Sequence, residues 1–152
     1  VHASVVRHDY THFGDLEWKF MPTLERASAA AYKLAGITDP LKEFDVAELY
    51  LPCSTCGVKW MDSLWFCEHG GAPALIRKGT FNMDGELPIN PSGGVISTNP
   101  IGATALIRIG EGAWQIMGKA GARQVEGARK ALCTGFGGCS WSDVMILGAD
   151  LP

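Results

Sequence analysis

The sequence predicts one layered α/β domain, and three observations support this prediction. The chain has 152 residues, 47% of them hydrophobic, which is enough to build the core of a single compact domain. Apolar runs of strand character alternate with segments of helical periodicity. No internal repeat or low-complexity stretch interrupts this alternation. The expected order is strand, helix, strand, helix, loop, helix, strand, strand, which favours helices layered on a sheet.

Charge and composition argue against several functional classes. The net charge is −3 with both signs interspersed, so the chain lacks the basic footprint of a nucleic-acid-binding protein. No apolar run approaches the roughly 20 residues that span a bilayer, and we expect no membrane partner. Five cysteines, an odd number, indicate a reduced, cytoplasmic protein. Because the chain opens on Val1 without an initiator methionine, we expect a piece of a longer polypeptide.

The first third of the chain contains two predicted strands and a helix. A strand is expected at residues 1–7. After an irregular aromatic stretch, Pro22 starts a helix for which Thr23 is the expected N-cap and Gly36 the stop signal. A second strand is expected at residues 44–50.

The remainder begins with a helix predicted at residues 55–66, followed by a loop-rich segment at 68–100. Loops of that length inside a compact domain are usually functional. A helix at 101–117 is apolar nearly all round, so we expect it to be covered on both sides. The chain then closes with two strands, at residues 129–134 and 143–147, and a glycine turn at 135–138 between them.

The segment at residues 89–104 carries the strongest signal for chemistry. Gly93 and Gly94 permit backbone conformations or close approaches that other residues do not allow. Asn99, followed by Pro100, stands just before a helix N-terminus, where N–H donors and the positive end of the helix dipole converge. Such a position suits the stabilisation of a developing oxyanion.

This segment resembles the thiolase superfamily pattern N-x-x-G-G-x-x-x-x-G-H-P-x-G-A-T-G, particularly the branch similar to sterol-carrier-protein thiolases and acetyl-CoA acetyltransferases. Residues 29–37 resemble the family's AY-x-x-AGI helix end, 44–50 its DVVELHD strand, and 120–129 its AG-x-RQV-x-GA segment. The resemblance spans the whole chain. It implies the C-terminal half of the layered α-β-α-β-α thiolase fold, a mixed sheet with helices on both faces.

The resemblance also implies one domain, 1–152, with three catalytic loops at 50–56, 90–104 and 133–138. Asn99 replaces the family's histidine, which activates a nucleophilic cysteine and binds the thioester oxygen. Asparagine is not a general base near neutral pH, although it still donates a hydrogen bond, as in type III ketosynthases. The alternative is an inactive protein in which Asn99 only caps the helix.

Two further side chains complete the expected catalytic set. Tyr50 ends its strand where relatives carry histidine or asparagine, and it is expected to donate to a carbonyl or enolate oxygen or to relay a proton. Cys133 matches the family's C-x-G motif, whose cysteine is the acid/base at the α-carbon. Both residues have a purely structural alternative, as a packed tyrosine and a buried strand cysteine. Backbone contributions are expected from Gly93, Gly94 and Gly135.

A zinc site is the competing interpretation of the cysteines. Cys53-x-x-Cys56, with Cys67 and His69, offers suitable ligand types and spacing. The helix predicted across this segment argues against it, so we expect no metal. Most of the basic residues are expected on the solvated surface, with one or two of them contacting coenzyme A phosphates: Arg7, Arg77, Lys78, Arg108, Arg123 and Arg129.

Taken with the resemblance, these residues predict an acyl-CoA acyltransferase of thiolase type, with a coenzyme A thioester as substrate and no further cofactor. An N-terminal thiolase half would supply the nucleophilic cysteine. The assembly is expected to be a homodimer or larger, with a possible zinc-ribbon/OB-fold partner subunit. Two alternatives stay open: a thiolase-fold aldolase acting on a β-hydroxyacyl-CoA, and a thiolase-like subunit without catalysis. Asn99 and Tyr50 both depart from the common pattern, and these departures favour the aldolase alternative.

Overall fold

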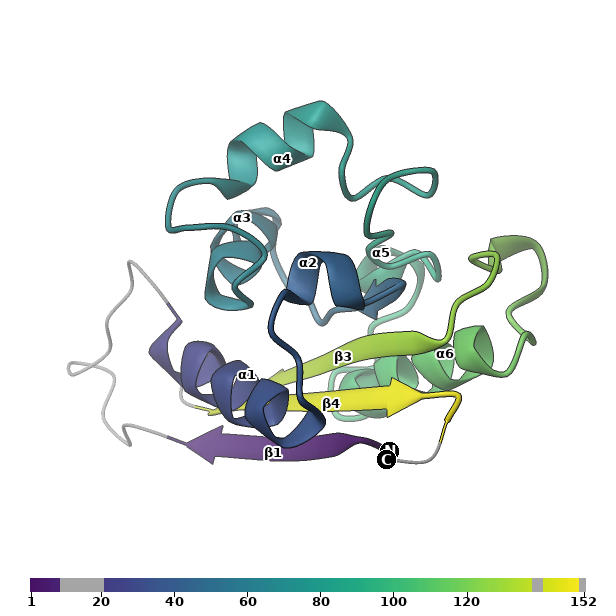
Figure 1. Ribbon diagram of the computed structural model, residues 1–152, viewed down its shortest axis with the longest axis horizontal. Coiled ribbons are helices and arrows are strands. Elements are labelled where there is room, and N and C mark those ends of the chain that lie inside the picture. Colours follow the sequence, from purple (N-terminus) through teal and green to yellow (C-terminus); the bar gives the residue numbers. More distant parts are fainter. Residues whose placement is uncertain (9–20, 138–140, 151–152) are drawn as a thin grey trace.

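The computed structural model describes residues 1–8, 21–137 and 141–150. The expectations for the aromatic stretch at 9–20 and for Gly138 fall outside these residues. Four strands form one mixed sheet in the order β1-β4-β3-β2, with helix α1 on one face and α6 on the other (Figure 1). The predicted α/β class, with a mixed sheet and helices on both faces, is confirmed.

The sheet combines two antiparallel pairings with one parallel pairing. Strand β4 (Trp141–Gly148) lies antiparallel to both β1 (Ala3–His8) and β3 (Lys130–Gly137). Strand β2 (Val46–Glu48) runs parallel to β3 at the sheet's end, and its last residue is opposite Cys133. The carboxyl ends of β2 and β3 therefore point the same way, and the loop after β2 leaves at that edge.

Helix α1 (Pro22–Ala35) covers the β1–β4 side of the sheet. It ends, as predicted, at Gly36, whose φ of 69° is the left-handed conformation that glycine adopts readily. The predicted N-cap is wrong: Met21 takes that position, and Thr23 lies inside the first turn, 2% exposed. Pro22 explains the shift, since its fixed φ and missing N–H suit the first helical position.

Short helices fill the region between β2 and α6. The sequence predicts a helix at 55–66, and in the structure helix α3 spans Ser54–Ser63. The segment at 68–100, expected to be loop, contains helix α4 (Ala72–Lys78) and helix α5 (Gly94–Ser97). The remaining short elements are helix α2 (Pro40–Glu43) and a 3-10 turn, η2 (Gly121–Arg123). Proline in the first turn of α4 and a left-handed Gly79 at its end are the signals that mark this unpredicted helix.

Helix α6 (Thr104–Ile116) packs on β3 and β2 and departs most from expectation. The sequence predicts a helix at 101–117 that is covered on both sides. The described chain instead buries a polar and small-residue side, with Thr104, Arg108 and Gln115 at most 1% exposed. The opposite side carries apolar residues that are open to solvent: Leu106 (70% exposed), Trp114 (47%) and Met117 (57%).

Two apolar clusters fill the two sides of the sheet. The larger joins α1, α3 and the sheet through residues such as Leu24, Trp60 and Leu132. The smaller lies under α6 and contains Cys133 and Leu147. The predicted glycine turn at 135–138 is wrong for its described part, because Gly135–Gly137 extend β3 and pair with β4.

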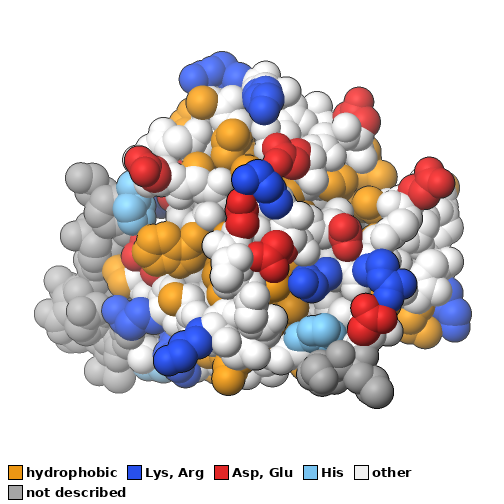
Figure 2. Space-filling view, viewed as in Figure 1, with side chains coloured by type: hydrophobic (Ala, Val, Ile, Leu, Met, Phe, Trp, Pro, Cys, Tyr) orange, Lys and Arg blue, Asp and Glu red, His pale blue; other side chains and the backbone are white. Residues whose placement is uncertain are grey.

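The surface agrees with the balanced composition. On the face shown in Figure 2, basic and acidic side chains are interspersed and do not gather by sign. Among the helices in the described ranges, none is long and apolar enough to cross a membrane.

Candidate functional site

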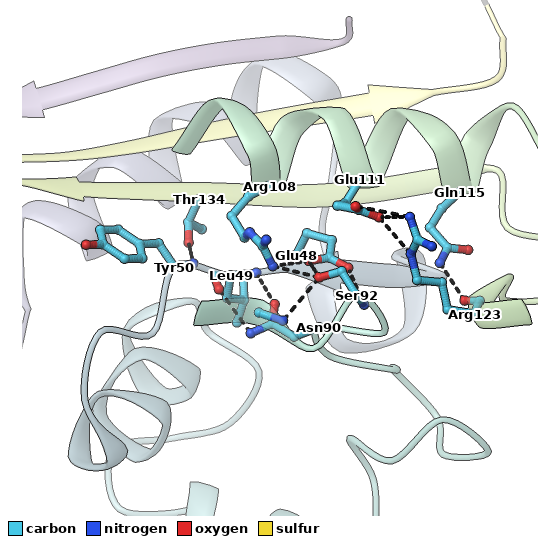
Figure 3. Close-up of polar contacts among 11 residues, drawn as sticks. Glu48, Leu49, Tyr50, Asn90, Ser92, Arg108, Glu111, Gln115, Arg123 and Thr134 are labelled. Carbon is cyan, nitrogen blue, oxygen red and sulfur yellow. Dashed lines mark hydrogen bonds and ion pairs between the residues drawn. The ribbon is translucent and has the colours of Figure 1, made fainter. Parts of the chain in front are cut away.

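A buried ion pair joins the end of β2 to helix α6 (Figure 3). Arg108 donates to Glu48 Oε2 across 2.9 Å, and the two side chains are 1% and 0% exposed. Ser92 closes the group: its hydroxyl donates to Glu48 Oε2 (2.7 Å) and accepts from Arg108 (2.6 Å). Burial raises the pKa of Glu48, while the bonds from Ser92 and the charge of Arg108 oppose that rise. Sequence reasoning placed Arg108 on the surface, and that expectation is wrong.

Asn90 ties the next loop to the same strand end. Its side-chain oxygen accepts from the Leu49 N–H (2.6 Å), and its amide nitrogen donates to the Leu49 carbonyl (3.0 Å). The side chain thus pairs with the backbone beyond β2 as a neighbouring strand would, continuing the bridge between Ala47 and Ile89. The loop after β2 and the loop at 90–104 are consequently fixed side by side.

The two glycines of the motif are required by geometry, as predicted. Gly93 has φ 88° and Gly94 φ 57°, both in the left-handed region. A Cβ on Gly93 would lie 2.8 Å from Ser97 Cβ, and one on Gly94 would lie 2.7 Å from the Asn90 amide nitrogen. Gly94 thereby leaves room for the side chain that anchors the loop. Their predicted part in an oxyanion site stays a prediction.

These two loops enclose a hollow of about 560 Å³, a volume within the range of small-molecule sites. Its walls are largely apolar, and one of the glycines discussed above forms part of them. One wall comes from the residues after β2 and the start of α3, the other from the glycine loop and α5: Leu51, Pro52, Cys53, Ser54 and Gly57, facing Asn90, Gly93, Val95 and Ile96.

Asn99 is exposed and stands before α6, as the sequence predicted. The buried Thr104 hydroxyl donates to Asn99 Oδ1 across 2.8 Å. That bond occupies the amide oxygen and leaves the amide N–H₂ group to donate elsewhere. The N-cap of α6 is Ala103, so Asn99 does not cap this helix. The arrangement suits a hydrogen-bond donor toward a carbonyl or enolate oxygen.

Tyr50 immediately precedes the residues that line the hollow. Its backbone N–H donates to Thr134 Oγ1 (3.1 Å), which fixes the start of the loop against β3. Tyr50 is 9% exposed, and its ring packs edge-on against Phe136, which in turn contacts Trp60. Tyr50 is thus held firmly by packing at the carboxyl edge of the parallel strands. Its proton-transfer role stays a prediction.

Cys133 is level with this edge, opposite Glu48, but its side chain lies on the α6 face of the sheet. Its side chain is fully buried on the α6 side of β3, and a Cβ on Gly112 would come within 2.4 Å of its sulfur. Burial, followed by the negative charge of Glu48, raises the pKa of the thiol. Tyr50 contacts the opposite side of the strand, through Thr134. The predicted acid/base role of Cys133 stays untested, and this placement gives it no support.

Asp143 is a candidate that the sequence analysis missed. It pairs with Gly135 on the strand-to-strand ladder, where a Cβ on Gly135 would meet the Asp143 carboxylate and Ala105 of α6. Gly135 is therefore required by a close approach within the sheet. Burial raises the pKa of Asp143, and a hydrogen bond from the Gly135 backbone opposes that rise.

The cysteines do not gather into the metal site weighed above. Within residues 1–8, 21–137 and 141–150, no group of three or more His, Cys, Asp or Glu side chains is placed to hold a metal ion. Cys53 and Cys56 are adjacent, with sulfurs 2.8 Å apart. Cys67 donates to Asp62 (3.1 Å) and lines a different hollow with His69.

The fold and this edge of the sheet indicate the class of protein. It is an α/β domain with a hollow of small-molecule size beside the carboxyl ends of parallel strands. The chain belongs to the thiolase C-terminal domain-like family, whose model matches residues 6–149. The resemblance inferred from the sequence is thereby confirmed.

Two curated relatives are similar in sequence. The acetyl-CoA acetyltransferase of Methanothermobacter thermautotrophicus is 35% identical over 113 residues, covering 74% of this chain and 29% of that protein. Sterol carrier protein 2 of Homo sapiens is 38% identical over 109 residues, covering 71% of this chain and 20% of that protein. The chain thus spans less than a third of the length of these relatives.

Among solved structures, the Ltp2-ChsH2(DUF35) aldolase has a similar fold, with a TM-score of 0.81 at 18% sequence identity. The match covers 98% of this chain and 39% of that chain. At this identity the likeness establishes the fold alone.

Proposed function

We propose that this chain is the C-terminal part of an acyl-CoA enzyme of thiolase type, which makes or breaks the carbon–carbon bond beside a thioester. The observation that supports it most is the hollow of about 560 Å³ between the loop after β2 and the glycine loop. The glycine loop resembles the family's motif, and a relative named acetyl-CoA acetyltransferase is 35% identical to this chain over 113 residues. The acyl-CoA is the substrate, and we invoke no further cofactor.

The proposal includes an N-terminal half that packs on this one. The apolar side of α6, defined by Leu106, Trp114 and Met117, is exposed in the described chain and suits such a contact. The structural neighbour is named after two proteins, Ltp2 and ChsH2, which supports the proposal of a further partner subunit. A homo-oligomer and a cytoplasmic location stay predictions.

Of the two reactions open to this class, the arrangement supports aldol cleavage of a β-hydroxyacyl-CoA better. Acyl transfer through a cysteine requires a base for that cysteine and an acid/base at the α-carbon. At the first position this chain has Asn99, which is not a base, and at the second Cys133, which is buried with a raised pKa. Aldol cleavage needs no nucleophilic cysteine and no base for one, and the proton for its α-carbon can come from the substrate's own β-hydroxyl.

In the proposed cleavage, the substrate's β-hydroxyl loses its proton as its oxygen forms a carbonyl and the Cα–Cβ bond breaks. The bond's electron pair passes into the thioester, giving an enolate that takes up a proton at Cα. Tyr50, which directly precedes the lining residue Leu51, accepts the hydroxyl proton and passes one to Cα, so that no proton is gained or lost. The Asn99 amide, oriented by Thr104, donates to the enolate oxygen.

Acyl transfer is the second candidate, favoured by the names of the relatives with 35% identity. It demands a nucleophilic cysteine and its base from the N-terminal half. The two candidates differ in one respect that a mass spectrum reveals: acyl transfer passes through an acyl-enzyme, whereas aldol cleavage does not.

The deciding experiment uses the protein expressed from its natural coding sequence, incubated with one β-hydroxyacyl-CoA and one β-ketoacyl-CoA. We expect cleavage of the former without a covalent acyl-enzyme, and a loss of about 10²–10⁴-fold in turnover for Tyr50→Phe. Tyr32→Phe is the matched control, because the Tyr32 hydroxyl is bonded to the Leu64 carbonyl (2.9 Å) within the core. It should lower stability and spare turnover.

An acyl-enzyme trapped with the β-ketoacyl-CoA would establish acyl transfer instead. Turnover of neither substrate, with coenzyme A thioesters failing to bind, would leave the non-catalytic subunit as the remaining alternative. Equal effects of Tyr50→Phe and Tyr32→Phe would show that the Tyr50 hydroxyl has no part in the chemistry.

A further inference from the structure

Two thiols stand at the start of helix α3, in contact with each other. Cys53 is the N-cap residue and Cys56 lies within the first turn, with their sulfurs 2.8 Å apart. The pair must close by less than about 1 Å to reach the roughly 2.05 Å of a disulfide bond. Both are reduced in this structure.

The environments of the two thiols differ in a way that assigns them separate roles. Cys53 is exposed and forms part of the wall of the hollow described above. Cys56 is half-buried and packs against the main apolar cluster. The first thiol is accessible to a small reagent from solvent, and the second is shielded but touches the first.

The electrostatic setting favours the thiolate at the exposed position. Cys53 sits at the N-terminus of a ten-residue helix, where backbone N–H groups and the dipole stabilise an anion. Hydrogen bonds from Cys56 and then Thr55 lower the pKa of the Cys53 thiol. The opposite holds for Cys67, where burial and a hydrogen bond to Asp62 raise the pKa to about 12.

We propose that Cys53 and Cys56 form a redox-active dithiol that reacts with low-molecular-weight disulfides of the glutathione type. The Cys53 thiolate attacks one sulfur of the reagent R–S–S–R, forming a mixed disulfide and releasing RS⁻. Cys56 then loses its proton and attacks the Cys53 sulfur, releasing a second RS⁻. Two protein thiols are oxidised to one disulfide, and the reagent is reduced to two thiols.

This inference is independent of the proposed function, because it depends on the pair's geometry and not on the reaction in the hollow. It also departs from the zinc interpretation of the same cysteines: Cys67 is engaged by Asp62 and does not join them. Because Cys53 lines the hollow, the mixed disulfide would place the R group in that space, whereas the internal disulfide would not.

The test uses the protein expressed from its natural coding sequence, reduced and then placed in glutathione buffers of increasing oxidation. Trypsin cuts after Lys42 and Lys59, so peptide 43–59 carries Cys53 and Cys56 and no other cysteine. We expect this peptide to lose two hydrogens and both alkylatable thiols, in the same range of buffers that oxidises a thioredoxin-type reference dithiol. Peptide 60–77, with Cys67, should remain reduced.

Two variants assign the roles. Cys56→Ser should stop at a glutathione adduct on Cys53, and Cys53→Ser should give neither adduct nor disulfide in peptide 43–59. Cys67→Ser is the matched control and should oxidise like the unmodified protein. In the reduced wild-type protein, Cys53 should react with iodoacetamide at least about tenfold faster than Cys67, given their thiolate populations.

Three results would overturn the proposal. One is a peptide 43–59 that stays reduced when the reference dithiol is fully oxidised. Another is equal alkylation rates for Cys53 and Cys67 in the wild-type protein, a measurement that needs no variant. The third is a stoichiometric zinc ion that protects Cys53 and Cys56 from alkylation until a chelator removes it.

Discussion

Arg108 on α6 and Glu48 at the end of β2 form an ion pair that solvent does not reach, 2.9 Å between Nη1 and Oε2. The pair connects the helix on one face of the sheet to the strand whose end leads into the hollow. Ser92 adds the glycine loop to the same contact. Three segments of the candidate site thus depend on one buried pair of charges.

We expect Arg108→Met to destabilise the protein by about 3–5 kcal/mol, because it leaves the Glu48 carboxylate buried without its partner. Replacing both, as Arg108→Met with Glu48→Leu, should recover most of that loss. Urea unfolding measures both. The control is Arg123→Gln at the more exposed pair with Glu111, where a change of about 1 kcal/mol or less is expected. Similar losses at the two arginines would contradict the special status of the buried pair.

Thr104→Val tests the orientation of Asn99. The substitution keeps the shape of a fully buried residue and removes the hydroxyl that donates to Asn99 Oδ1. Turnover of the β-hydroxyacyl-CoA should fall by about 10–100-fold with little change in KM, since misplacement of a donor costs rate more than binding. Thr104→Ser should restore it. Turnover within twofold of wild type for the valine variant would show that Thr104 is not a positioning residue.

Cys133→Ser separates a core thiol from a catalytic one. A hydroxyl in the apolar cluster under Gly112 is costly, so we expect a destabilisation of about 1–3 kcal/mol. Turnover per folded molecule should change by no more than a few-fold. Cys133→Ala, which adds no polar atom, is the companion measurement. A loss of about 10²–10⁴-fold in turnover at retained stability would instead establish the acid/base role inferred from the C-x-G motif.

Asp143→Asn should stabilise the protein, and the gain should depend on pH. Burial raises the pKa of Asp143 in the fold, so the folded protein holds this proton more tightly than the unfolded chain does. Its contribution to stability is present below the unfolded-state pKa near 3.8 and is lost as pH rises through the folded-state pKa. The asparagine variant does not ionise, so its advantage in melting temperature should be larger at pH 7 than at pH 4. An advantage that shrinks as pH rises would contradict this sign.

The apolar side of α6 predicts that the 152-residue chain by itself self-associates. Leu106→Lys should shift sedimentation toward the monomer. Leu34→Lys is the matched control, because Leu34 is equally exposed (69%, against 70% for Leu106) but lies on α1. A wild-type chain that sediments as a folded monomer would argue against the proposed contact with an N-terminal half.

The sequence predicts the features that depend on local geometry. Gly36 marks the end of α1 because a left-handed residue follows its last turn, and Gly93 and Gly94 mark a loop that other residues cannot form. Asn99 is correctly placed before α6 for a similar reason, since the helix start is a local signal. The order of the family's motifs along the chain predicts the remaining features of the fold.

Contacts between distant segments are beyond such reasoning. Arg108 and Glu48 are 60 residues apart, and charged residues in isolation are expected at the surface. Cys133 illustrates a subtler limit. Its motif identifies the strand, but side chains alternate along a strand, so one position decides whether a residue faces α6, as Cys133 does, or Tyr50, as Thr134 does.

The contacts that join the loops of the site have a consequence for how the chain folds. Leu49 meets Asn90 across 41 residues, Glu48 meets Arg108 across 60, and Tyr50 meets Thr134 across 84. Closing such long segments is entropically expensive, and proteins rich in them fold slowly. We therefore expect the contact between Leu49 and Asn90 to form first and the contact between Tyr50 and Thr134 last. Until a ribosome has released the chain beyond Thr134, this set of contacts is incomplete and the apolar strands are exposed to aggregation.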